Sequence, residues 1–152
     1  MNKEKIKQPQ VADQIAKLAM LEALGFERRE GRNPADVSRC PEFAGIDIVS
    51  VKKDGSEART IEVKGTTNES DLTFHETEVN ASNMRIVASH LYVYLFPKEG
   101  KGKDRRKQCR LILIPRENIK PSDFKEGKYY RLSWDVVRRN KKSESVSLFG
   151  VK

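Results

Sequence analysis

Two carboxylates and a lysine lie close together in a segment with the pattern of a β-hairpin. Asp47 lies in one short apolar run, Glu62 and Lys64 lie in the next, and Asp54–Gly55 between them is a strong hairpin-turn signal. With Asp54–Gly55 as the loop, the register places Asp47 directly opposite Glu62, at a Cβ separation of about 4.5–5.5 Å. Lys64 is two residues from Glu62 and shares its face. Like charges that face each other destabilise a hairpin, so this pattern indicates a functional site.

Two facing carboxylates are typical ligands of a divalent cation such as Mg²⁺, which keeps its other positions for water and phosphate. Such a cation polarises a phosphoryl oxygen and activates water. A lysine beside it can stabilise the charge that develops in the transition state. The alternative is a surface hairpin in which Lys64 forms a cross-strand salt bridge with Glu62 or Asp47. The isoleucine and valine neighbours of both carboxylates favour strands that are buried on at least one face.

At these residues the chain resembles the PD-(D/E)XK nuclease superfamily, whose signature is an aspartate on one strand and Glu-x-Lys on the next. More narrowly, the chain is similar to the NO VEIN-type branch, which is related to Mrr-like restriction endonucleases. The similarity lies in the runs Gly45-Ile46-Asp47-Ile48, Ile61-Glu62-Val63-Lys64-Gly65-Thr66 and Leu72…Glu78…Ala81, within about residues 10 to 115. The resemblance implies an α/β fold of the α+β kind, with an αβββαβ core and a central mixed sheet flanked by helices. It also implies a metal-dependent nuclease, although such folds also serve as inactive binding modules.

The resemblance assigns roles to individual residues. Asp47 and Glu62, with the backbone carbonyl of Val63, would bind Mg²⁺ or Mn²⁺, and Lys64 would position or activate the attacking water. These residues form the predicted catalytic and metal site.

Four secondary candidates follow from the same resemblance. The family carries a glutamate on its first helix, and counting back from Gly25, where that helix is expected to end, reaches Gln14. Glu22 is a weaker substitute on the same helix. Glu78 would contact the water shell of the metal or orient Lys64, and otherwise it interacts with a helix N-terminus. His75 is a candidate acid or base, with a structural role as the alternative.

The 152 residues predict a single domain, with a core over about residues 10–135 and a tail, residues 138–152, that has no clear pattern. The chain has no apolar run of membrane-spanning length and no apolar stretch near its start, which predicts a cytoplasmic protein without a membrane partner. Cys40 and Cys109 fit no metal or disulfide spacing and are expected to be free thiols.

Hydrophobic periodicity predicts the elements that must position the site. A helix is expected over Pro9–Leu24 with Gly25 as its stop, and a loop over residues 27–44. The remaining expectations are a short strand at Leu72–Phe74, a helix from Glu76 to about Ser89, and strands at Leu91–Phe96, Cys109–Ile114 and Tyr129–Trp134.

The net charge of +8 is concentrated in two segments. Residues 98–107 connect two expected strands and predict a protruding basic hairpin tip, and a second basic run begins at Arg138. Such clusters attract a phosphate backbone without reading its sequence, whereas the alternative is a solvated surface. The nucleic-acid-binding candidates are Lys101, Lys103, Arg105, Arg106, Lys107, Arg138 and Arg139.

The combined prediction is a Mg²⁺-dependent endonuclease that acts on nucleic acid, with double-stranded DNA as the expected substrate, in restriction, defence or repair. So small a domain would gain specificity from a homodimer, from its basic loop or from a larger nuclease–helicase complex. Two alternatives stay open: a non-catalytic nucleic-acid-binding subunit, which Gln14 in place of the helix glutamate favours, and a scaffold module of a larger complex.

Overall fold

The central element is a six-stranded mixed sheet with the strand order β1-β2-β3-β5-β6-β9. The structure is a computed structural model and describes residues 11–81, 88–100, 102–127, 129–140 and 144–146. The strands β3 and β5 run parallel, and the other neighbours are antiparallel. The strands of this sheet are β1 (Arg32–Asp36), β2 (Ile48–Lys52), β3 (Arg59–Thr66), β5 (Ala88–Leu95), β6 (Arg110–Pro115) and β9 (Glu144–Val146).

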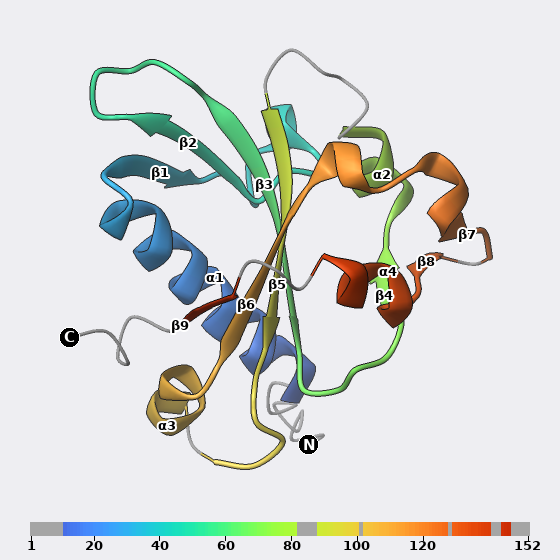
Figure 1. Cartoon of the computed structure of the whole chain (residues 1–152). Helices are drawn as coiled ribbons and strands as arrows, with labels where there is room; N and C mark the ends of the chain where they lie inside the picture. Colours follow the sequence, from blue (N-terminus) through green and yellow to red (C-terminus); the bar gives the residue numbers. More distant parts are fainter. Residues whose placement is uncertain (1–10, 82–87, 101, 128, 141–143, 147–152) are drawn as a thin grey trace, which may run out of the picture.

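A long helix, α1 (Val11–Arg29), covers one face of the sheet (Figure 1). Ile15, Ala19 and Ala23 form its buried stripe and pack on Ile61 of β3. Gly65 of β3 allows this close approach, because a Cβ there would lie 2.9 Å from the Ala19 Cβ.

The other face is covered by a three-stranded sheet of order β4-β8-β7 together with α4. Figure 1 shows this layer on the opposite side of the main sheet from α1. Its core joins apolar side chains of both sheets and of α4, among them Phe74, Leu91 and Trp134. The remaining elements are β4 (Leu72–Phe74), β7 (Phe124–Lys125), β8 (Tyr130–Leu132), α2 (Glu76–Ala81), α3 (Gly102–Lys107), α4 (Trp134–Arg139) and the 3-10 helices η1 (Pro41–Phe43), η2 (Arg116–Asn118) and η3 (Pro121–Asp123).

The expected α/β fold with a central mixed sheet flanked by helices is confirmed. The αβββαβ order also holds, but the prediction for its strands was partly wrong. Residues 27–44, expected as a loop, contain the end of α1, the strand β1 and η1, and β1 is the first strand of the core. Leu72–Phe74 is a strand, as expected, yet it belongs to the small sheet.

The first helix does not stop at Gly25, which is buried within it. In this continuation of the helix, Glu27 is fully buried and bound by groups from distant strands. Arg59 Nη2 donates to it at 2.6 and 2.7 Å, and Ser50 Oγ donates at 2.9 Å. The chain turns at Gly31, whose φ of 75° is a left-handed conformation that glycine adopts without strain.

Three further boundaries differ from the prediction. The basic segment contains the helix α3, so it is not a simple hairpin tip, and Trp134 opens α4 and does not end a strand. The helix expected to reach Ser89 is described as far as Ala81, and residues 82–87 lie outside the described part of the chain. Ser89 itself belongs to β5. No helix among the described residues has the length and apolar character needed to cross a membrane.

Candidate active site

The site begins where β2 leaves the edge of β3. Ile48 pairs with Ile61 and Val49 pairs with Thr60, as the predicted register requires. The predicted pair of Asp47 with Glu62 does not form, because β2 begins at Ile48 and the backbone N–H of Asp47 binds Ile61 O. The turn is longer than predicted, because pairing ends at Ser50 opposite Arg59 and Lys52 N donates to Ser56 O.

Asp47, the residue directly before β2, is also bound to β3. The backbone N–H of Asp47 donates to Ile61 O at 3.2 Å, and the N–H of Val63 donates to Asp47 Oδ2 at 2.8 Å. Asp47 thus binds backbone groups of β3 that would otherwise pair with a neighbouring strand. Backbone groups two residues apart point to the same side of a strand, so the Val63 carbonyl also points toward this open edge.

Glu62 and Lys64 lie on the face of β3 opposite α1, because they alternate with Ile61, Val63 and Gly65, which face the helix. Lys64 Nζ lies 2.6 Å from Glu78 Oε2 and 3.5 Å from Glu62 Oε1. It also lies 4.6 Å from the centre of the Phe74 ring, a cation–π contact. The ammonium group is therefore held between two carboxyl groups and an aromatic ring.

Glu78 comes from α2 and has two roles in this arrangement. Its Oε1 accepts a hydrogen bond from the backbone N–H of His75 at 3.0 Å, directly before the helix, while its Oε2 binds Lys64. Glu78 therefore makes both of the contacts that the sequence alternatives expected: one at the start of α2 and one with Lys64.

Gly45 fixes the loop that carries Asp47 against α2. Its φ is 82°, and a Cβ at this position would lie 2.2 Å from the carbonyl oxygen of Thr77 and 2.9 Å from Glu78 N. Only glycine fits both the conformation and the space. The contact sets the distance between the Asp47 loop and the helix that supplies Glu78.

The electrostatics of the cluster show crowded negative charge. Burial, followed by a hydrogen bond with Glu78 and the charge of Asp47, raises the pKa of Glu62 to about 11. Burial also raises the pKa of Asp47, although the hydrogen bond from Val63 and the charge of Lys64 oppose this rise. The pKa of Glu78 is lowered overall. Burial alone would raise it, but the hydrogen bond with Glu62 and the charge and hydrogen bond of Lys64 outweigh burial.

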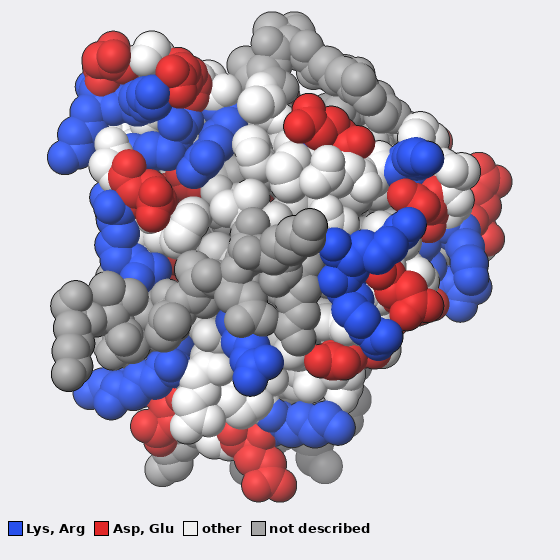
Figure 2. Space-filling model, viewed as in Figure 1, with Lys and Arg blue, Asp and Glu red and all other residues white. Residues whose placement is uncertain are grey.

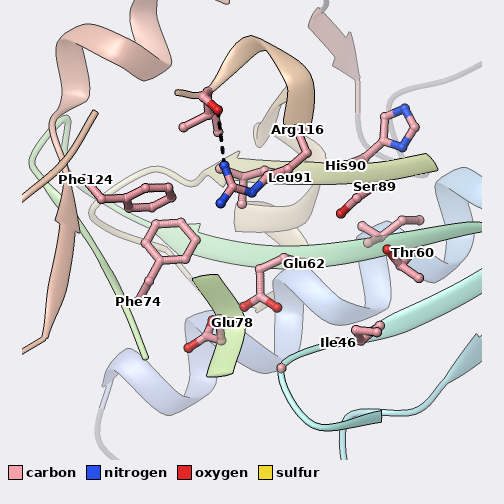
Figure 3. Close-up of a pocket in the computed structure, with 13 residues that line it drawn as sticks. Ile46, Thr60, Glu62, Phe74, Glu78, Ser89, His90, Leu91, Arg116 and Phe124 are labelled. Carbon is pink, nitrogen blue, oxygen red and sulfur yellow. Dashed lines mark hydrogen bonds between the residues drawn. The ribbon is translucent and has the colours of Figure 1, made fainter. Parts of the chain in front are cut away.

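A small pocket lies beside Glu62 on the same face of the sheet, and Figure 3 shows the Glu62 and Glu78 carboxyl groups close together at its side. Phe74 and Phe124 line it, as does Arg116, which lies over the Phe124 ring at 4.8 Å. Its volume of about 20 Å³ is enough for about one water molecule. Glu62 also lines a larger and more open groove, together with Asp47 and Lys64.

The donor set of the cluster suits a hard cation. Asp47 Oδ1, the Glu62 carboxylate and the Val63 carbonyl are oxygen ligands of the kind that Mg²⁺ prefers, and water would complete its shell. No group of three or more histidine, cysteine, aspartate or glutamate side chains within the described residues is arranged to enclose a metal ion. A cation would therefore depend on two protein carboxylates, the carbonyl and water.

The two helix candidates do not join this cluster. Gln14 is exposed and is not among the groove-lining residues; from α1, the side chains beside Asp47 are Ala16, Lys17 and Met20. The count that selected Gln14 started from Gly25, which does not end the helix. Glu22 is 1 % exposed and binds Arg106 Nε at 2.6 Å, so it links α1 to α3.

His75 lies at the border of the groove and is exposed. Its ring meets the ring of Tyr129 edge-on, with a centroid distance of 5.4 Å and an interplanar angle of 84°. Sequence reasoning missed Tyr129 as well as Lys17 and Arg39, which line the hollow on the other side of Asp47. Proximity to Asp47 in the chain could have indicated Arg39, whereas no sequence signal indicated Lys17 or Tyr129.

The predicted basic segment is remote from the cluster. Figure 1 shows α3 and α2 at opposite ends of the molecule, and Figure 2 shows acidic and basic side chains interspersed over the visible face. Arg106 is bound to Glu22, and Arg105 Nη2 donates to Lys98 O at 2.6 Å.

Among the other basic candidates, Lys103 and Lys107 are exposed, and Lys101 lies outside the described residues. Arg138 and Arg139 form ion pairs of 3.6 Å with Asp135 and Asp123. The structure thus brings Asp47, Glu62, Lys64 and Glu78 together and does not bring the basic candidates to them. Of the two cysteines, Cys40 is exposed, Cys109 is buried, and both are free thiols.

One comparison with known proteins gives a match. The family model described as Protein NO VEIN, C-terminal matches residues 15–108, which is more than half of the chain. The matched range contains all four residues of the cluster and ends before β7 and β8 of the small sheet. No curated protein and no solved structure matches the chain.

Proposed function

This chain belongs to the NO VEIN C-terminal family, and we propose that it is a metal-dependent endonuclease of the PD-(D/E)XK type that cleaves phosphodiester bonds in DNA. The observation that carries the proposal is the open edge of β3. There the Asp47 side chain binds the Val63 N–H at 2.8 Å, and Glu62 and Lys64 lie in the same groove.

Asp47, Glu62 and the Val63 carbonyl would hold Mg²⁺ or Mn²⁺. When bound, such an ion neutralises phosphoryl charge and makes water a better nucleophile. Burial and, to a lesser degree, neighbouring carboxyl groups raise the pKa of both Glu62 and Asp47, and a bound cation would offset this cost of ionising them.

Lys64 would orient the attacking water and stabilise the negative charge that forms on the phosphoryl oxygens. Glu78 holds the Lys64 ammonium at 2.6 Å and the Phe74 ring lies 4.6 Å away, so the lysine is positioned before substrate binds. A group held in place in this way loses less freedom when the reaction occurs.

A second candidate function is a non-catalytic nucleic-acid-binding subunit with the same fold. The observation that favours it is the small donor set, since the described residues hold no group of three potential metal-binding side chains. Gln14 is exposed and does not supply the missing acidic group.

A Mg²⁺ titration separates the two functions. The nuclease should show Mg²⁺-dependent cleavage of a DNA substrate, and Asp47→Asn should remove both the cleavage and the heat of Mg²⁺ binding in calorimetry. DNA binding with a salt dependence but with no response to Mg²⁺ would support the binding subunit. A protein that does neither would be a scaffold.

A further inference from the structure

The hollow that contains Asp47, Glu62 and Lys64 has a neighbouring hollow on each side. It shares Ser38, Asp47 and Val63 with a second hollow beside α1, and it shares His75 with a third hollow beside β8. The three hollows therefore lie next to one another across the open edge of β3, and Asp47 and Glu62 line the middle one. We refer to this row of hollows as the cross-edge groove.

The α1 end of the cross-edge groove contains two exposed cations together with the carboxylates of Asp36 and Asp47. Lys17 and Arg39 line it, and both side chains are exposed. Asp36 lines it as well, but one of its carboxylate oxygens accepts hydrogen bonds from Ser38 N at 3.0 Å and from Ser38 Oγ at 2.6 Å. This end suits the phosphate backbone of a nucleic acid, because exposed cations attract phosphates without reading sequence.

The β8 end has a different chemistry. Tyr129 is 43 % exposed, and its ring is braced edge-on by His75. Glu76 and Glu126 also line this end. Carboxylates repel phosphates but accept hydrogen bonds from the amino groups of nucleobases, and an exposed tyrosine ring offers a face on which a base can stack. This end therefore suits a base.

We propose that the cross-edge groove binds a single nucleic-acid strand, whose phosphates contact Lys17 and Arg39 and whose unpaired base, on the other side of Asp47, stacks on Tyr129. The base must be unpaired because both faces of a base inside a duplex are covered by its neighbours. The inference rests on the proposed nuclease function and specifies its substrate as a single strand or the frayed end of a duplex. It also places the binding surface in this groove and not on α3.

The test measures binding in EDTA, where no cleavage occurs, with fluorescein-labelled single-stranded DNA and with a blunt duplex of the same sequence. Tyr129→Ala should weaken single-strand binding about 10-fold and leave duplex binding unchanged, whereas Tyr129→Phe should retain affinity. A set of oligonucleotides with 2-aminopurine at successive positions should show one position whose fluorescence is quenched by the wild-type protein and not by Tyr129→Ala.

The charged end is tested through salt dependence. Replacing Lys17 and Arg39 together by alanine should lower the log–log salt slope for a single strand by about 1.4, or about 0.7 for each phosphate contact. The matched control replaces Lys103 and Lys107 of α3 by alanine, which removes the same charge from an exposed surface outside the groove. The control should leave the slope nearly unchanged.

Two results would overturn the inference: unchanged single-strand affinity of Tyr129→Ala, or equal slope losses in the Lys17/Arg39 variant and the control. The nuclease proposal fails separately. If the wild-type protein binds a single strand through the groove but does not cleave with Mg²⁺, the groove inference stands and the nuclease proposal is wrong. If Mg²⁺-dependent cleavage occurs and neither variant alters it, the nuclease proposal stands and the groove inference is wrong.

Discussion

The carboxyl group of Glu62 gives a direct test of the site, because its pKa is raised to about 11 by burial and by neighbouring carboxylates. In the metal-free folded protein Glu62 therefore keeps its proton at pH 7, whereas in the unfolded chain it ionises near its ordinary value of 4.5. Between these two values the folded state binds one more proton than the unfolded state. The free energy of unfolding consequently falls as the pH rises through this window.

The size of the effect follows from the value of one pKa unit, about 1.4 kcal/mol. From 4.5 to pH 7, Glu62 lowers the free energy of unfolding by up to about 3 kcal/mol relative to acidic solution. A glutamine has the shape of the protonated carboxyl group and needs no proton. We therefore expect Glu62→Gln to raise the free energy of unfolding in EDTA at pH 7 by about 2–3 kcal/mol.

Urea denaturation in EDTA at several values between pH 5 and pH 8 measures this effect. Wild-type stability should contain a component that falls over this range, and Glu62→Gln should lack it. The control is Asp54→Asn in the exposed turn, where hydrogen bonds from the Ser56 hydroxyl and backbone lower the pKa of Asp54. It should keep the Glu62 component. Addition of 10 mM Mg²⁺ should stabilise the wild type, by about 1.4 kcal/mol for a millimolar site, and not Glu62→Gln.

One result would refute this reasoning. If Glu62→Gln is no more stable than the wild type at pH 7, Glu62 is ionised in the metal-free protein. Its 3.5 Å contact with Lys64 would then be an ordinary salt bridge, as in the surface-hairpin alternative.

Three further predictions concern the same cluster. Asp47→Asn should change metal-free stability by less than about 1 kcal/mol, because the amide oxygen still accepts from Val63 N, and should abolish Mg²⁺-dependent cleavage; a larger loss in urea denaturation would make Asp47 a structural residue. Lys64→Ala should lower the single-turnover rate at saturating enzyme by about 100-fold or more with DNA affinity nearly unchanged, and parallel losses of both would contradict a transition-state role. Gly45→Ala should lower the free energy of unfolding by about 2–4 kcal/mol in thermal denaturation. The control is Gly31→Ala, which should lose about 1 kcal/mol, because Gly31 also has a positive φ but no atom within 4 Å of the added Cβ. Equal losses would exclude the close approach of Gly45 to α2.

The hairpin register could be predicted from the sequence because it depends on local information. The Asp54–Gly55 turn signal and the apolar pattern on either side define which residues face each other. The register survives even though the turn is longer than two residues, since Ile48 still pairs with Ile61. Asp47, Glu62 and Lys64 could be grouped for the same reason.

The end of α1 and the binding surface could not be predicted, because both depend on partners distant in the sequence. Glu27, beyond the predicted end of the helix, is bound from other strands by groups that include Arg59 and Ser50. The net charge of residues 98–107 likewise does not show that Arg106 is bound to Glu22 of α1. Composition counts charges, whereas a binding surface depends on which charges remain exposed beside the site.

Gly45 and Gly65 belong to the same short sequence pattern as Asp47, Glu62 and Lys64, and both allow close backbone approaches around the site. Gly45 brings the Asp47 loop against the backbone of α2, and Gly65 brings β3 against α1. The first contact sets Asp47 against Glu78, and the second fixes the strand that carries Glu62. The glycines are therefore part of the site geometry although neither has a reactive group. A variant that keeps every charged residue but adds a Cβ at Gly45 should lose the alignment of the carboxylates, and with it the cation-binding geometry.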